Sequence, residues 1–209
     1  MRKTAEFSYE ILAAALIIIF TVLLCAEYLW LYVLSKKNEE TDIQKREINS
    51  RIHAMTEAFL YSPTASSRET ELTSLIEYIG DDPLKRDEAS VQLIQLIKRS
   101  EDIPPEKLRA LGRLYESLDP IEFYSKQLES GNYYEKSYAV RRLADFNASD
   151  KTEEIRKLLD DKHADVVYNA AMALSELGDM ESVLVFAQKC ENNRYYSHRV
   201  LLELFQTYS

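Results

Sequence analysis

The longest apolar stretch of the chain covers residues 11–34. It is 24 residues long and contains a single charged residue, Glu27. A helix needs roughly 20 apolar residues to cross the ~30 Å hydrocarbon core of a bilayer. Aromatic residues lie near both ends of the stretch, as they do at the interfaces of spanning helices: Phe7 and Tyr9 before it, and Tyr28, Trp30 and Tyr32 in its last part. The pattern predicts a short N-terminal tail over 1–10 and a transmembrane helix over 11–34.

A removable signal peptide is the competing interpretation of this stretch. Met1-Arg2-Lys3 is a short basic region of the kind that precedes the apolar part of a signal peptide. Cleavage, however, requires small residues at the first and third positions of a recognition triplet. The best candidate triplet, Leu24-Cys25-Ala26, has a bulky leucine at the first position. The spanning helix is therefore favoured.

Residues 35–62 contain neither glycine nor proline. Ile48, Ile52, Met55 and Phe59 recur there at steps of four and three residues, which predicts that the helix continues as a stalk. This stripe fits a coiled-coil seam, which would make a homodimer, or packing against the following helices. Packing is favoured because two heptads are short for a coiled coil.

Glycine and proline in the rest of the chain stand mostly where helices should begin or end. Asp82-Pro83 and Asp119-Pro120 each combine an N-cap residue with proline at the first helical position. Ser66 and Glu69 have the spacing of a capping box. No segment alternates with a period of two, so the predicted fold class is all-α, with degenerate helical hairpins over 63–131.

The last part of the chain repeats at a shift of 31 residues, which predicts one helical hairpin per period. The aligned apolar positions are Ala139, Val140, Leu143 and Phe146; Ala170, Ala171, Leu174 and Leu177; and Leu201, Leu202, Phe205 and Tyr208. Amphipathic segments at 153–160 and 181–190 lie between these sets and supply the first helix of each hairpin.

Residues 165–179, Asp-Val-Val-Tyr-Asn-Ala-Ala-Met-Ala-Leu-Ser-Glu-Leu-Gly-Asp, resemble the second helix of a HEAT repeat in its short bacterial form. The resemblance covers 132–209 and implies an α-helical solenoid of antiparallel helix pairs, with Gly178 ending the helix in a left-handed conformation. It places Ala171 between neighbouring repeats and Ser175 on the opposite side. Tyr168 stands where the family usually has arginine, so the Asp–Arg ladder of many HEAT proteins is not implied.

Tyrosine is the residue type that points to function. Six of the 14 tyrosines lie near the starts of the predicted second helices: Tyr133, Tyr134, Tyr138, Tyr168, Tyr195 and Tyr196. Such helices line the concave face of a HEAT stack, and tyrosine is a frequent interface anchor. Tyr134, Tyr168 and Tyr195 are candidate protein-binding residues, with packing between repeats as an equal alternative. Packing in the core is favoured for the other three.

Composition and motifs argue against catalysis and nucleic-acid binding. The net charge is −9, with no basic stripe for a phosphate backbone. Gly-rich phosphate loops, Gly-x-Ser-x-Gly and His-Glu-x-x-His are absent from the sequence. His53 and His163 are far apart, and His198 with Cys190 would supply only half a metal site. We therefore expect no catalytic residue, cofactor or metal.

Basic residues indicate the orientation of the predicted membrane helix. Arg2 and Lys3 precede it, whereas Lys36, Lys37, Lys45 and Arg46 follow it. The positive-inside rule then places the C-terminal domain in the cytoplasm, at the cell membrane.

The expected function is that of a membrane-anchored scaffold or adaptor that mediates protein–protein interaction. Two alternatives stay open. One is an accessory subunit of an integral membrane machine, such as an envelope glycan synthase or a transporter. The other follows from the similarity to PBS lyase HEAT-like proteins and is a lyase.

Overall fold

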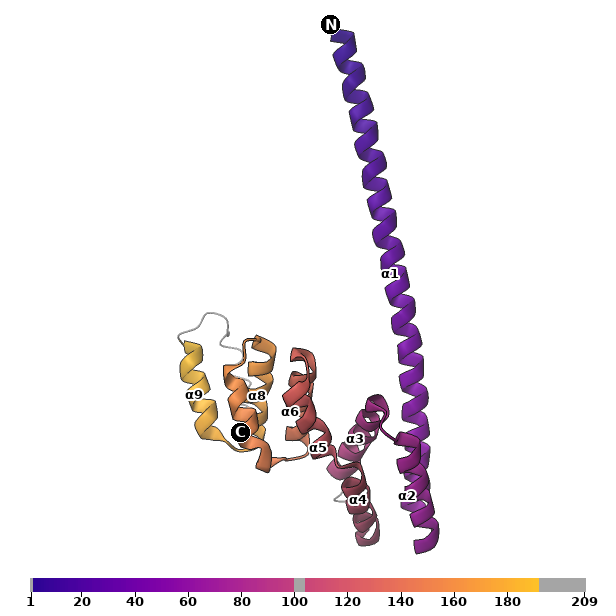
Figure 1. The fold of residues 1–209 in the computed structure, drawn as a ribbon, viewed down its shortest axis with the longest axis vertical. Helices are drawn as coiled ribbons and strands as arrows, with labels where there is room; N and C mark the ends of the chain where they lie inside the picture. Colours follow the sequence, from indigo (N-terminus) through magenta and orange to yellow (C-terminus); the bar gives the residue numbers. More distant parts are fainter. Residues whose placement is uncertain (1, 100–103, 192–209) are drawn as a thin grey trace. The chain divides into compact units, whose positions relative to one another are not determined.

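The computed structural model describes residues 2–99 and 104–191, and the regular secondary structure in these ranges is helical, without strands (Figure 1). The chain divides into two compact units, Met1–Ala54 and Met55–Ser209. The α-helices are α1 (Arg2–Tyr61), α2 (Ala65–Ile79), α3 (Pro83–Lys98), α4 (Pro105–Leu118), α5 (Pro120–Ser130), α6 (Tyr133–Asp145), α7 (Thr152–Lys157), α8 (Ala164–Glu176) and α9 (Met180–Glu191). Two 3₁₀ turns, η2 (Ser149–Lys151) and η3 (Leu158–Asp160), flank α7.

Helix α1 is a single helix of 60 residues that runs through the apolar stretch and on to Tyr61. Within the described part of the chain, it is the one helix that is long and apolar enough to cross a membrane, judged by length and composition. Large apolar side chains between Ile19 and Val33 are exposed, unlike those of a core helix. Membrane anchors and N-terminal signal sequences share these properties.

The end of α1 belongs to the second unit and is buried in it. Phe59 and Leu60 are 0% and 6% exposed, and Thr56 is also buried. Because this burial occurs within one chain, the last part of the apolar stripe packs intramolecularly, as the packing interpretation expected.

Helix starts follow the cap residues in the sequence. The carboxylate of Asp82 accepts hydrogen bonds from the backbone of Leu84 and Lys85, and Asp119 caps α5 in the same way, which confirms both predictions. The capping box expected at Ser66 is wrong. Helix α2 begins at Ala65 because the hydroxyl of Thr64, two residues before Ser66, already accepts from a backbone N–H of the first turn.

The second helices of the repeated hairpins are α6 and α8. They bury equivalent residues, and each member of both sets is 0% exposed: Ala139, Val140 and Leu143, and Ala170, Ala171 and Leu174. The 31-residue period is therefore confirmed for these two copies. The third copy, residues 201–208, lies outside the described residues.

Both helices also end in the same way. Gly178 has φ +83° and follows α8, as predicted, whereas Asn147 has φ +53° and follows α6. At each end two backbone hydrogen bonds close the last turn: Asp179 to Leu174 and Gly178 to Ser175 after α8, and Ala148 to Leu143 and Asn147 to Ala144 after α6. This is the Schellman motif, in which glycine or asparagine takes up the left-handed conformation.

Helix α8 lies in the middle of the repeats, packed against α6, α7, η3 and α9 (Figure 1). Ser175 was expected to face away from the repeat contact, but it is only 2% exposed. That expectation is wrong because α8 has neighbours on several sides, so little of its circumference reaches solvent. Ala171, by contrast, is buried as expected.

Candidate functional site

Tyr134 is the most exposed of the candidate binding residues that the structure describes, at 70%. It occupies the second position of α6. The side chain of Asn132 accepts hydrogen bonds from the backbone of Tyr134 and Glu135, at 3.0 and 3.1 Å, and Glu135 accepts from the backbone of Asn132 at 2.9 Å. This capping box, which the sequence analysis missed, holds the turn that presents the Tyr134 ring to solvent.

Tyr133 lies beside Tyr134 and was expected in the core. Its ring is 49% exposed and stacks on His163, with the ring centroids 4.7 Å apart and the planes at 18°. His163 is the N-cap residue of α8, so the stack joins the starts of two successive second helices. The expectation is wrong because Tyr133 is the first residue of α6, before the first buried position of the helix.

The other candidates are placed differently. Tyr168 is half-buried in α8. It comes 34 residues after Tyr134, whereas the repeat is 31 residues long. Three extra residues rotate a position by about 300° around a helix, so the two rings do not occupy equivalent positions. Tyr195, together with Tyr196, lies outside the described residues.

Tyr138 packs inside the domain, as expected, and forms part of a polar network that the sequence did not reveal. Its hydroxyl donates to Oδ2 of Asp87 at 2.9 Å, and the hydroxyl of Tyr124 donates to Oδ1 of the same carboxylate at 2.8 Å. Asp87 lies on α3, Tyr124 on α5 and Tyr138 on α6, so one carboxylate joins three helices. We call these three residues the tyrosine clamp.

Arg142 extends the tyrosine clamp along α6. It donates to the Tyr138 hydroxyl at 2.9 Å and pairs with Asp145 at 3.1 Å, and Asp145 also pairs with Lys98 at the end of α3. The pKa of Tyr138 is raised to about 12, and burial is the largest cause. Asp87 raises this pKa further, whereas the hydrogen bond from Arg142 lowers it. Burial and Asp87 also raise the pKa of Tyr124. Both phenols therefore stay protonated at neutral pH and act as hydrogen-bond donors that position helices.

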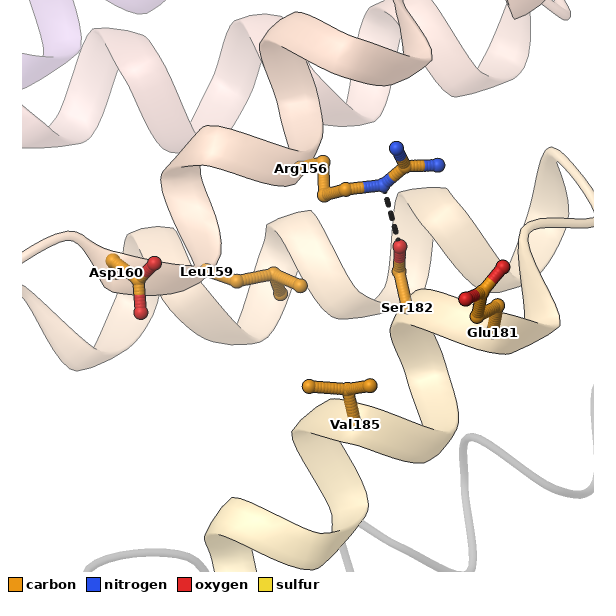
Figure 2. A pocket seen from close by; sticks show the side chains of 6 residues that line it. All are labelled: Arg156, Leu159, Asp160, Glu181, Ser182 and Val185. Carbon is orange, nitrogen blue, oxygen red and sulfur yellow. Dashed lines mark hydrogen bonds between the residues drawn. The ribbon is translucent and has the colours of Figure 1, made fainter.

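A groove lies between the end of α7 with η3 and the start of α9, with a volume of about 280 Å³ (Figure 2). Its lining residues are Arg156, Leu159, Asp160, Glu181, Ser182 and Val185.

Arg156 connects the two sides of this groove. It donates to Ser182 Oγ at 2.6 Å and to Asp179 Oδ2 at 2.8 and 3.1 Å, and it also pairs with Glu153. Burial acts to raise the pKa of Asp179, but hydrogen bonds from Ser182 and Arg156 outweigh it and hold this pKa below its usual value. An arginine–aspartate pair thus joins neighbouring repeats, although it does not involve Asp165, which is exposed.

Metal-ligating side chains are dispersed in the described ranges. No group of three or more histidine, cysteine, aspartate and glutamate residues is placed there to hold a metal ion.

A family model described as HEAT repeats matches residues 121–195. The C-terminal part of the chain belongs to the HEAT repeat family. No match was found among curated proteins or among solved structures.

The HEAT match begins inside α5, upstream of the start at residue 132 that the sequence analysis expected. Helix α5 lacks the alanine-rich signature, but Tyr124 and Leu128 join the same core cluster as α6 and α8. The first HEAT repeat therefore consists of α5 and α6, the second of α7 and α8, and α9 begins the third. Stacked helix pairs of this type offer extended surfaces to protein partners.

Proposed function

We propose that this protein is a membrane-anchored scaffold or adaptor whose HEAT repeats bind a protein partner at the membrane surface. The observation that carries the proposal is the HEAT match over residues 121–195, together with the repeated helix pairs. Repeats of this family generally mediate protein–protein interaction through extended surfaces.

The anchor in this proposal is the N-terminal half of α1. Its large side chains between Ile19 and Val33 are exposed and apolar, as in a helix surrounded by lipid. The basic residues after this apolar segment favour a cytoplasmic C-terminal domain by the positive-inside rule: Lys36, Lys37, Lys45 and Arg46. The full-length protein should then stay in the membrane pellet after carbonate washing, while a truncated chain starting at Glu39 should be soluble. A mature protein that starts near Cys25 would instead demonstrate a cleaved signal peptide.

The proposed binding residues are Tyr134, Tyr168 and Tyr195. Tyr134 is exposed at a capped helix start, and its sequence neighbour Tyr133 stacks on His163. These two observations support an aromatic anchor at this end of α6. Because the chain is acidic, with a net charge of −9, the fitting partner carries lysine or arginine around its apolar contact residues.

The decisive experiment is capture of the partner after alanine substitution. A partner is first identified by affinity purification in mild detergent. Each of three variants should weaken partner binding about thirtyfold or more, which corresponds to about 2 kcal/mol, without a large change in Tm: Tyr134→Ala, Tyr168→Ala and Tyr195→Ala. Tyr61→Ala is the matched control, because Tyr61 is 68% exposed and Tyr134 is 70% exposed. Unfolding of all three variants would show that the rings are packing residues.

A second candidate function is that of an accessory subunit of an integral membrane machine. It is favoured by the exposed aromatic residues of α1, Tyr28, Trp30 and Tyr32, which are available to another membrane helix. Replacing residues 11–34 with a polyleucine span separates the two functions. Partner capture should survive the replacement if the HEAT repeats bind the partner, and should be lost if the membrane helix does. A lyase activity gains no support from the described residues and is not part of the proposal.

A further inference from the structure

The groove between η3 and α9 has an apolar centre with carboxylates on both sides. Figure 2 shows Leu159 and Val185 in the middle, with Asp160 beyond Leu159 and Glu181 on the opposite side. The volume of about 280 Å³ falls just below the ~300–1,000 Å³ of typical small-molecule pockets. The groove is therefore sized for one or two side chains of a peptide segment.

The charges around the groove favour a ligand with positive charge. Arg156 is the only cation among the lining residues, and its guanidinium already donates to Asp179, Ser182 and Glu153. Two carboxylates, Asp160 and Glu181, line the groove with this cation, and two more, Glu153 and Asp179, pair with its guanidinium. An anionic ligand would meet net repulsion, whereas a cationic group is attracted.

The start of α9 is held in place before any ligand arrives. Asp179 accepts hydrogen bonds from Arg156 and from the backbone of Ser182, at 2.8 and 3.2 Å. The first turn of α9 thus cannot move without breaking these bonds, and Val185 stays opposite Leu159. A preformed groove binds a peptide at a lower entropic cost than one that must be ordered first.

We propose that this groove docks a short segment of a protein partner in which an apolar side chain stands between two lysine or arginine residues. The apolar side chain enters between Leu159 and Val185, and the flanking cations lie near Asp160 and Glu181. This inference rests on the proposed scaffold function and deepens it, because it specifies the chemistry of the partner and a second contact surface on the first helices of the repeats.

Two synthetic peptides test the proposal on the full-length protein in lipid nanodiscs. Fluorescein-labelled Gly-Ser-Lys-Leu-Lys-Ser-Gly should bind saturably by fluorescence anisotropy, and its affinity should fall as salt is added. The charge-reversed peptide Gly-Ser-Glu-Leu-Glu-Ser-Gly should bind at least about tenfold more weakly, because of the carboxylates.

Adjacent residues of α9 provide a matched pair of variants. Val185 lines the groove and is 48% exposed, while its neighbour Leu184 is 49% exposed and is not among the lining residues. Val185→Lys should lower the affinity for the lysine peptide about tenfold or more, whereas Leu184→Lys should lower it by less than about twofold. Glu181→Gln, a change at an exposed residue that spares the fold, should weaken binding several-fold and reduce its salt dependence.

Three results would overturn the proposal: no binding of the lysine peptide, equal binding of both peptides, or equal loss in Val185→Lys and Leu184→Lys. These results are distinguishable from failure of the scaffold function. If the peptide does not bind while Tyr134→Ala still weakens capture of the whole partner, only the groove is excluded. If Tyr134→Ala has no effect while the peptide binds as expected, the groove stands and the tyrosine site is excluded.

Discussion

Asp87 and Tyr138 are 51 residues apart in the chain, yet the hydroxyl of Tyr138 donates a 2.9 Å hydrogen bond to the carboxylate of Asp87. Asp87 belongs to α3, upstream of the HEAT match, and Tyr138 to the first HEAT repeat. The tyrosine clamp therefore joins the earlier helices to the repeats through a charged hydrogen bond, which is stronger than a neutral one.

Removing one hydroxyl of the tyrosine clamp should destabilise the domain. Tyr124 is 0% exposed and donates to Asp87 at 2.8 Å, so Tyr124→Phe leaves the carboxylate with an unused acceptor. We expect a loss of ~1.5–3 kcal/mol in the free energy of unfolding, measured with urea. Tyr115→Phe is the control, since no described residue hydrogen-bonds the Tyr115 hydroxyl, and it should change the stability by less than ~0.5 kcal/mol. Equal effects would contradict the role of the clamp.

The stability of the domain should fall in alkaline solution. The pKa of Tyr138 is raised to about 12, chiefly by burial, and that of Tyr124 is also raised. A tyrosine in the unfolded chain has a pKa of about 10, so the folded state binds these protons more tightly. The stabilisation is fully present below about pH 10 and is lost as the pH rises through the folded value.

Urea unfolding across this alkaline range measures the effect. Tyr138→Phe should have a lower free energy of unfolding at pH 8 and a shallower decline above about pH 10, because one titrating group is gone. A decline as steep as that of the unsubstituted protein would show that other groups cause it.

Two glycines should respond to alanine in opposite directions. Gly178 has φ +83° with no atom within 4 Å of an added Cβ, so Gly178→Ala costs backbone strain alone, of ~1–2 kcal/mol. Gly112 lies inside α4 with the same free space, and Gly112→Ala should stabilise the domain by ~0.5–1 kcal/mol through helix propensity. Thermal unfolding distinguishes them, and a stabilising Gly178→Ala would refute the Schellman end of α8.

Overpacking should identify the contact face of α8. Ala171 is 0% exposed in the shared core, so Ala171→Leu should cost ~1–3 kcal/mol. Ala164, at the exposed start of the same helix, is the control, and Ala164→Leu should stay within ~0.5 kcal/mol. Similar melting temperatures for the two variants would mean that the 31-residue register is misassigned.

The sequence alone determined the helices and the repeat. Asp82, Asp119 and Gly178 mark helix ends because caps and left-handed residues act within a few positions of the backbone they satisfy. Ala139 and Ala170 mark the core because helical periodicity is local and the period of 31 residues compares one hairpin with the next.

Only the tertiary structure decided which surfaces of those helices remain free. Ser175 is buried and Tyr133 is exposed, against expectation, because burial depends on how many neighbours surround a helix and where it begins relative to them. The partners in the tyrosine clamp are 37 and 51 residues apart, and those of Arg156 at the groove are 23 and 26 residues apart. No local pattern records such pairs, because the distance between two side chains on different helices is set by packing of the whole domain.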